Sequence, residues 1–219
     1  LMLIVRYADG RETIVRTNRS WQTLKEPPYR IGTPYQQSRR ISAIEDYDAR
    51  LLDASWRLPG WDGAGRTRAA KPANIGPDEW PLERQPIPEG VEEADIVPAK
   101  LASPDPEAQL FDAGAVVTGW PKLKLPGVAG AIVRLRYSED LDERGRVKHN
   151  VSNETSENYY DQYTMRGDAV ESWAPDFSYK AFRYVEVTGY PAPIEPGDGL
   201  VVAAARTGIS CLGSVRCSD

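Results

Sequence analysis

The sequence predicts an all-β protein with two domains on either side of a proline-rich connection, the second of them a sandwich. The 219 residues include 18 prolines and 18 glycines but only two methionines. This composition favours short strands joined by turns over helix bundles. Short apolar runs also recur at regular spacing in the second half of the chain, which is typical of a sandwich. In residues 182–188 bulky and polar side chains alternate, as in a strand with one buried face.

The N-terminal region predicts a β-hairpin. Residues 3–7 and 13–17 are rich in strand-forming side chains, and the Asp9-Gly10 pair between them is a strong short-range hairpin signal. A second ordered patch is predicted at residues 45–52. It is followed by a turn-rich stretch that contains Trp61.

The middle of the chain changes in composition. Closely spaced prolines in residues 71–109 exclude long helices and central strands, but leave room for a short strand near residues 91–101. The second domain then supplies regularly spaced strands, at residues 114–125, 131–138, 159–165, 182–188 and 200–204. The predicted boundaries are 1–70 for the first domain, 71–109 for the connection, 110–205 for the second domain and 206–219 for the start of a further linker.

Charge and hydropathy exclude several classes of partner. The net charge of −5 comes from interspersed acidic and basic residues, so no basic stripe is available to follow a nucleic acid backbone. No stretch reaches the roughly 20 apolar residues that span a bilayer, and the apolar start is too short for a signal peptide core. Cys211 and Cys217 provide neither a disulfide framework nor the ligand set of a structural zinc site. We expect a chain that is cut at both ends, with no nucleic acid or membrane partner.

An acidic cluster after the strand at 131–138 resembles a pair of catalytic carboxylates. It consists of Glu139, Asp140, Asp142 and Glu143. Because the cluster lies in a predicted turn beside Arg144 and Arg146, we interpret it as solvated, with contact to a metal or a sugar as the alternative. His149 is the only histidine, so it cannot form a histidine-rich metal site, and we expect it in an exposed loop. In residues 182–188, we expect Arg183 and Glu186 on the polar face or in ion pairs.

The residues that we predict to contact carbohydrate are Asp48, Arg50 and Trp61. Strand alternation would put Asp46, Asp48 and Arg50 on one face, where a carboxylate beside a guanidinium either holds sugar hydroxyls or ties the strand to a loop. We favour a structural pair between Asp48 and Arg50 at the edge of the sandwich. Trp61 and Trp80 lie in Gly- and Pro-rich loops and could stack on sugar rings. Trp120 and Trp173 are predicted to be core residues.

The second domain resembles a known family in the order and spacing of its motifs. The segments FDAGAVVTGWPKLKLPGVAGAIVRLRYSEDLDERGRV, DQYTMRG and WAPDFSYKAFRYVEVTGY are similar to the concanavalin-like β-sandwich domain of bacterial α-L-rhamnosidases. Upstream, EDYDARL with the later Pro59-Gly60 turn is similar to the end of the family's N-terminal β-sandwich domain. Residues 213–219 resemble the segment that leads into its catalytic domain. The chain departs from the pattern at residues 114–116, where many relatives have Gly-Gln-Asn, and at 180–181, where a His-Gly pair is common.

The resemblance implies a fragment of an inverting glycoside hydrolase that releases terminal α-L-rhamnosyl residues. Both domains would be jelly-roll or concanavalin-like sandwiches, with the first incomplete. Inversion requires two carboxyl groups roughly 6.5–9.5 Å apart, and in this family they lie on a helical toroid after the β domains. We therefore assign no catalytic residue and no metal ligand to this chain, and we expect it to be inactive alone.

The resemblance also implies the partners. These would be rhamnose-containing glycans or glycosides and a downstream catalytic domain of the same chain. No cofactor is expected, because calcium occurs in the family's accessory domain but no motif here supports it. A bacterial origin is implied, with a cytoplasmic or secreted location left open. A stand-alone carbohydrate-binding or structural sandwich module is the alternative function.

Overall fold

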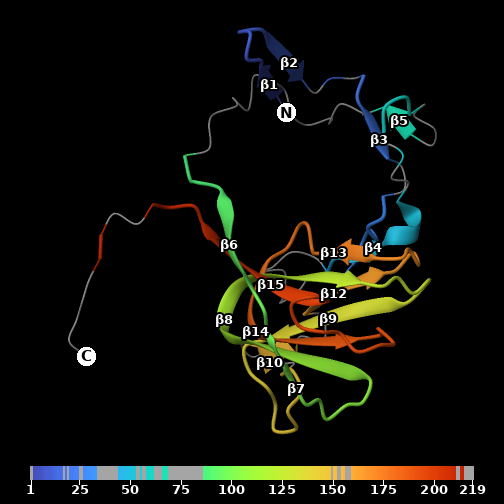
Figure 1. Cartoon of the computed structure of the whole chain (residues 1–219), viewed down its shortest axis with the longest axis vertical. Helices are drawn as coiled ribbons and strands as arrows, with labels where there is room; N and C mark the ends of the chain where they lie inside the picture. The colour runs from blue at the N-terminus through green and yellow to red at the C-terminus, as the bar shows by residue number, and fades with distance from the viewer. Residues whose placement is uncertain are drawn as a thin grey trace. The chain divides into compact units, whose positions relative to one another are not determined.

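The computed structural model describes residues 2–16, 18, 20–24, 27–33, 44–52, 55, 58–61, 66–68, 86–148, 150–151, 154–155, 159–210 and 213–214. These residues form strands, turns and one short 3-10 helix, so the predicted all-β class is confirmed (Figure 1). Within them, no helix is long and apolar enough to span a bilayer. The chain divides into two compact units: unit 1 comprises residues 1–27 and 51–84, and unit 2 comprises residues 28–50 and 85–219.

Unit 1 contains two small antiparallel sheets in its described part. They pair β1 (Met2–Arg6) with β2 (Glu12–Arg16), and β3 (Gln22–Leu24) with β5 (Arg66–Arg68). The first pair is the predicted hairpin. Its turn is closed by a hydrogen bond of 2.9 Å from the amide of Tyr7 to the carbonyl of Arg11. Gly10 has a φ of 83°, a left-handed conformation that glycine adopts without strain.

Unit 2 is built on one nine-stranded sheet with the order β4-β12-β9-β14-β8-β15-β6, with β7 and β13 paired to β8 outside this path. Its strands are β4 (Asp46–Asp48), β6 (Gly90–Ile96), β7 (Ala99–Leu101), β8 (Ala108–Leu125), β9 (Ile132–Ser138), β12 (Tyr160–Thr164), β13 (Glu171–Trp173), β14 (Lys180–Thr188) and β15 (Leu200–Thr207). A short hairpin of β10 (Asn150–Val151) and β11 (Glu154–Thr155) lies outside it. The 3-10 helix η1 (Ala49–Leu51) follows β4 directly.

The long strand β8 causes the sheet to curl. Its first part pairs with β7 and β14, and its last part pairs with β15 and β13. Strand β14 pairs with β8 on both sides of a register shift, because Val117 opposes Phe182 whereas Asp112 opposes Tyr184. Residues 113–116 therefore bulge from the ladder, and Gly114 takes a φ of 85° there. One continuous strand thus serves both layers of a sandwich (Figure 1).

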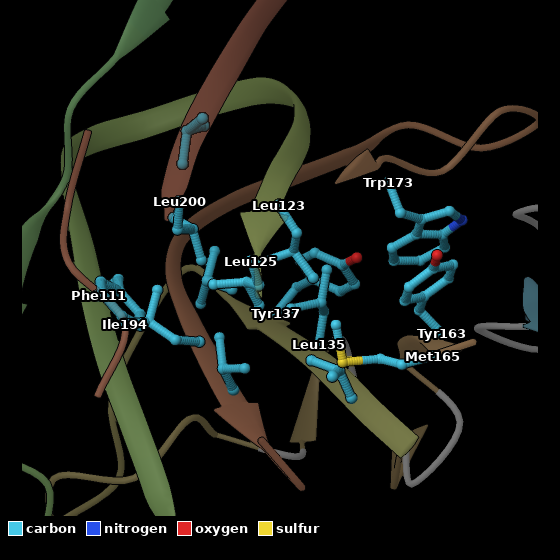
Figure 2. Close-up of a cluster of buried hydrophobic side chains, with 14 of the residues drawn as sticks. Phe111, Leu123, Leu125, Leu135, Tyr137, Tyr163, Met165, Trp173, Ile194 and Leu200 are labelled. Carbon is cyan, nitrogen blue, oxygen red and sulfur yellow. The ribbon is translucent and has the colours of Figure 1, made fainter. Parts of the chain in front are cut away.

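The core lies on the inner face of this curled sheet (Figure 2). Phe111 of β8, Leu135 of β9 and Phe182 of β14 are completely shielded from solvent. At one end of the cluster the rings of Tyr163 and Trp173 stack at a centroid distance of 5.3 Å. Full burial of each large apolar side chain stabilises the fold by about 1.5–3 kcal/mol relative to its exposure. Trp173 is therefore a core residue, as predicted.

The main strands of the second domain appear where the sequence predicts them. The prediction at 131–138 corresponds to β9, the one at 159–165 to β12 and the one at 182–188 to β14. Strand β8 begins earlier than predicted, at Ala108, and β15 continues to Thr207. The short strand expected near 91–101 is present as β6 and β7. The two are separated by Val97 and Pro98, because proline has no amide hydrogen for a ladder.

Candidate functional site

Asp48 and Arg50 form the ion pair that the sequence predicts. The Nε and Nη2 atoms of Arg50 donate to the two carboxylate oxygens of Asp48 at 2.8 and 2.7 Å. The backbone amide of Arg50 also donates to Asp48 Oδ1 at 3.0 Å, so Asp48 caps the start of η1. The hydrogen bond from the Arg50 side chain holds the pKa of Asp48 below its usual value. The two side chains thus satisfy each other's hydrogen-bonding groups where β4 ends.

The reason for this pairing differs from the predicted one. Strand β4 ends at Asp48, and Arg50 lies in η1, so strand alternation does not extend from Asp46 to Arg50. The one-face argument was wrong for Arg50, because the chain turns into a helix at Ala49. The pair forms instead across the first residues of a helical turn, where side chains two positions apart in sequence can meet through a capping carboxylate.

The third predicted carbohydrate contact, Trp61, lies in a different unit of the chain. Trp61 is half-buried and belongs to unit 1, whereas Asp48 and Arg50 belong to unit 2. Trp120 is half-buried in β8. Several other residues singled out in the sequence lie outside the described residues, namely Trp80, His149, Cys211 and Cys217.

The acidic cluster after β9 forms a turn whose carboxylates are exposed. The Oδ1 atom of Asp142 accepts hydrogen bonds of 2.9 Å from the amides of both Arg144 and Arg146. These amides keep the pKa of Asp142 below its usual value. Glu139, Asp140 and Glu143 are exposed. A carboxylate that organises its own turn has no apolar environment to raise its pKa, so this geometry does not produce a general acid.

A buried polar network joins side chains of β9, β12 and β14, and no local sequence pattern predicts it. Asp161 is fully buried and Lys180 is 3% exposed. The ammonium group of Lys180 donates to Asp161 Oδ2, and the hydroxyl of Tyr137 donates to the same oxygen at 2.9 Å. Burial raises the pKa of Tyr137 well above its usual value. Asp161 and Lys180 are 19 positions apart, so no local sequence pattern indicates that they meet.

The segment before β4 enters this network through Glu45. Its amide donates to Asp161 Oδ1 at 2.9 Å. Its carboxylate accepts hydrogen bonds from the amides of Asp176 and Phe177 at 2.9 and 2.7 Å. Burial raises the pKa of Glu45 against the opposing effect of these two amides. Glu45 thereby fixes the loop between β13 and β14.

Two more carboxylates, one buried and one half-buried, are bound on the outer face of the sheet. Glu186, 1% exposed, accepts two hydrogen bonds from the guanidinium of Arg146 at 2.6 and 2.8 Å. Asp112 accepts two hydrogen bonds of 2.8 Å from Arg183, which hold its pKa below the usual value. The prediction that Arg183 and Glu186 take part in ion pairs is confirmed.

Glu171 closes the turn before β13. Its carboxylate accepts hydrogen bonds from the Tyr163 hydroxyl at 2.7 Å and from three successive amides of residues 166–168 at 3.0, 2.7 and 3.1 Å. Burial would raise the pKa of Glu171, but these four donors outweigh it and lower the pKa below its usual value. The carboxylate of Glu171 thus accepts four hydrogen bonds from within the fold.

These contacts determine what the described residues can do chemically. The buried carboxylates Glu45, Asp161, Glu171 and Glu186 each accept several hydrogen bonds from within the fold. A structural carboxylate of this kind is not available for proton transfer to a substrate. In the part of the chain that the structure describes, no group of three or more His, Cys, Asp or Glu side chains could hold a metal ion.

Two open grooves lie beside the loop that connects β7 to β8. The larger, of about 730 Å³, is lined by residues of this loop and by residues 189–193. Two of its polar side chains, Lys100 and Gln109, are bonded to the carbonyls of Ile194 and Ala192. The smaller groove, of about 440 Å³, adjoins the turn that carries Asp142 and Arg146. Most of the polar side chains that line the two grooves already form hydrogen bonds within the fold.

Comparison with known proteins agrees with this non-catalytic geometry. Residues 103–203 match the family model described as the bacterial α-L-rhamnosidase concanavalin-like domain. An α-L-rhamnosidase of Streptomyces avermitilis is 32% identical over 190 residues, which cover 86% of this chain and 17% of the relative. One from Formosa agariphila is 26% identical over 224 residues, covering 100% of this chain and 22% of the relative. The chain thus spans about a fifth of the length of the curated relatives it matches.

The fold is also similar to that of solved structures. The α-L-rhamnosidase from Dictyoglumus thermophilum superposes with a TM-score of 0.79 at 26% identity, over 99% of this chain and 23% of that one. The Streptomyces avermitilis enzyme complexed with L-rhamnose gives a TM-score of 0.75 at 27% identity, over 94% of this chain and 19% of that one. Residues 103–203 thus form a concanavalin-like domain of the kind found in bacterial α-L-rhamnosidases.

Proposed function

We propose that this chain forms the accessory, non-catalytic β portion of an enzyme that hydrolyses terminal α-L-rhamnosyl residues with inversion. The observation that carries the proposal is the match of residues 103–203 to a concanavalin-like domain in a chain that spans only 17–23% of its relatives. The buried carboxylates already accept hydrogen bonds from within the fold, and this supports the proposal. The proton transfers of an inverting mechanism need two carboxyl groups that are free to act on the substrate. Its partners would be rhamnose-containing glycans or glycosides and a catalytic domain in the same longer chain.

The test is a hydrolysis assay of the chain by itself. The purified protein is incubated with an aryl α-L-rhamnoside, next to a heat-treated sample and an active α-L-rhamnosidase. We expect release no faster than in the heat-treated sample. Release of rhamnose above that background, in proportion to protein concentration, would contradict the accessory role.

The domain division at 1–70, 71–109, 110–205 and 206–219 also stays a proposal. Two observations bear on it. Strands β6 and β7 fall between residues 71 and 109, and they pair with β15 and β8. Residues 28–50 group with the second unit.

The carbohydrate contacts at Asp48, Arg50 and Trp61 remain a prediction as well. A binding module without an enzyme is the alternative function for this chain. Calorimetry with L-rhamnose, with and without calcium, separates it from a scaffold, because only a binding module gives a saturable heat. Loss of that heat in Arg50→Ala or Trp61→Ala would support the predicted contacts.

A further inference from the structure

The loop between β13 and β14 exposes aromatic side chains. Phe177 is 74% exposed and Tyr179 is 66% exposed, whereas Pro175, Ser178 and Lys180 of the same stretch are buried. Phe177 and Tyr179 are two positions apart, on either side of the buried Ser178. Exposed apolar side chains that gather in one place can mark a binding site.

The backbone of this loop is fixed from below. The amides of Asp176 and Phe177 donate to the buried carboxylate of Glu45. The hydroxyl of Ser178 accepts a hydrogen bond of 2.9 Å from the buried ammonium of Lys180. The loop is therefore held by charged groups that are themselves locked into the network around Asp161. Groups fixed before a ligand arrives lose less conformational entropy on binding.

A polar group lies beside the rings. The Oδ2 atom of the exposed Asp176 carboxylate accepts a hydrogen bond from the hydroxyl of Tyr29. The ring of Tyr29 contacts that of Phe177 edge-on at a centroid distance of 5.2 Å. An ionised carboxylate has about four lone-pair positions, so its capacity to accept is not used up by this hydroxyl. The carboxylate is oriented and remains open to solvent next to an aromatic surface.

We propose that Phe177, Tyr179 and Asp176 form a carbohydrate-binding subsite, here called the aromatic platform, for a 6-deoxyhexopyranoside. The C–H face and the methyl group of the sugar pack on the two rings, and a ring hydroxyl donates to Asp176. The identity of the sugar as a rhamnosyl residue rests on the proposed function. Two side chains are too few for a stable protein partner, which needs about 800 Å² on each side. They suit one pyranose ring.

The test is a titration with methyl α-L-rhamnopyranoside, followed by amide NMR shifts and by calorimetry. The protein, Phe177→Ala and Tyr179→Ala are compared, and Tyr7→Ala serves as the control because Tyr7 is an exposed tyrosine of unit 1. We expect saturable binding in the millimolar range, with shifts centred on residues 176–180. Each platform substitution should weaken it by about tenfold, and Tyr7→Ala should leave it unchanged. Unaltered melting temperatures would show that both variants fold.

A second sugar tests the orientation of the ligand without any substitution. L-Mannose differs from L-rhamnose by a hydroxyl on C6, which would place a polar group against the rings, so we expect it to bind several-fold more weakly. Absence of saturable binding to the unaltered protein, unchanged binding by both Phe177→Ala and Tyr179→Ala, or equal affinity for both sugars would each overturn the platform. These outcomes leave the accessory role intact, since that role fails only if the chain itself releases rhamnose.

Discussion

Asp161 shows why a buried charge can be kept in an otherwise apolar core. It has 0% exposure, and its two oxygens accept from Glu45, Tyr137 and Lys180. A buried ion pair adds little net stability when it is complete, because desolvation opposes the attraction between the charges. Removal of one partner is costly, because the other charge remains buried without compensation. The contribution of this pair is therefore visible mainly when it is broken.

We predict that Asp161→Ala lowers the free energy of unfolding by about 3–5 kcal/mol. The matched control is Lys122→Ala, which breaks a partly exposed pair with Glu92 and Asp95 and should cost about 1 kcal/mol or less. Urea denaturation followed by tryptophan fluorescence measures both. Equal losses for the two variants would contradict this account of the network.

We predict a smaller effect for Asp48→Ala. The substitution removes the cap of η1 and the partner of Arg50, and the loss of a capping side chain costs about 1 kcal/mol. The ion pair itself adds little, because the Arg50 side chain is 54% exposed. The control is Arg30→Ala, whose side chain is 75% exposed and lies 3.4 Å from Asp46. A melting temperature of Asp48→Ala equal to that of the unaltered protein would refute a structural role.

At the residue scale, the sequence predicted the identity of both partners only where they are close along the chain. Asp48 and Arg50 are two positions apart, and the pair could be predicted even though the strand argument was wrong. Glu45 and Phe177 are separated by 132 positions. Nothing in either local sequence indicates their contact, because it depends on which strands become neighbours in the sheet. The exposure of Phe177 could not be predicted either, because Phe177 lies in a loop whose course depends on this contact.

At the scale of elements, the close approach of β8 and β15 depends on a glycine. A Cβ atom added at Gly119 would lie 1.8 Å from the carbonyl oxygen of Ala203. We therefore predict that Gly119→Ala forces the two strands apart and destabilises unit 2 strongly. Gly90→Ala is the control, because its added Cβ would lie 4.0 Å from the nearest atom, the carbonyl oxygen of Arg206. Thermal unfolding measures both, and similar melting temperatures would contradict the prediction.

The longer strands of unit 2 have a strong local pattern, and its shortest strands do not. Strand β9 alternates exposed or half-buried side chains with Val133, Leu135 and Tyr137, which are buried. Strand β4 has only three residues and pairs in parallel with β12, so its place in the sheet comes from a partner 116 positions away. Strand β13 is equally short. For such strands the tertiary partner decides the conformation, and the local sequence carries little information.

At the scale of the whole molecule, the carboxylates of unit 2 predict how stability varies with pH. The folded state lowers the pKa of Asp48, Asp112 and Glu171 through hydrogen bonds to their charged forms. Unfolded Asp and Glu titrate near pH 3.9 and 4.3. The stability that these groups contribute is present above about pH 4 and is lost as the pH falls through their folded pKa values.

We predict that the free energy of unfolding falls between pH 5 and pH 2.5. Glu45 acts in the opposite direction, because its pKa is raised and its contribution declines as the pH rises through its folded pKa. Urea denaturation at pH 7, 5 and 3 measures the balance. Asp112→Asn removes one of the groups with a lowered pKa, so the free energy of unfolding of this variant should fall less between pH 5 and pH 2.5. A midpoint that stays constant across this range would refute the assignment of the lowered pKa values.

The all-β class and the order of the main strands follow from the sequence because turn residues and alternating patterns are local properties. The curling of one sheet into two layers does not follow from them. It involves the long strand β8, which pairs with β14 on both sides of the bulge at residues 113–116 and with β15 at residues 119–123. The aromatic platform depends in turn on that architecture, because the loop that carries Phe177 is anchored by Glu45, from a distant part of the chain.

Residues 28–50 have a practical consequence for anyone who divides this protein for expression. They belong to unit 2 although residues of unit 1 precede and follow them. A gene segment that starts at residue 85 would encode a sheet without β4, with the edge of β12 uncovered and without the Glu45 carboxylate under Phe177. The matched region at 103–203 is therefore shorter than the folding unit that contains it. An expression boundary before residue 28 keeps that unit whole.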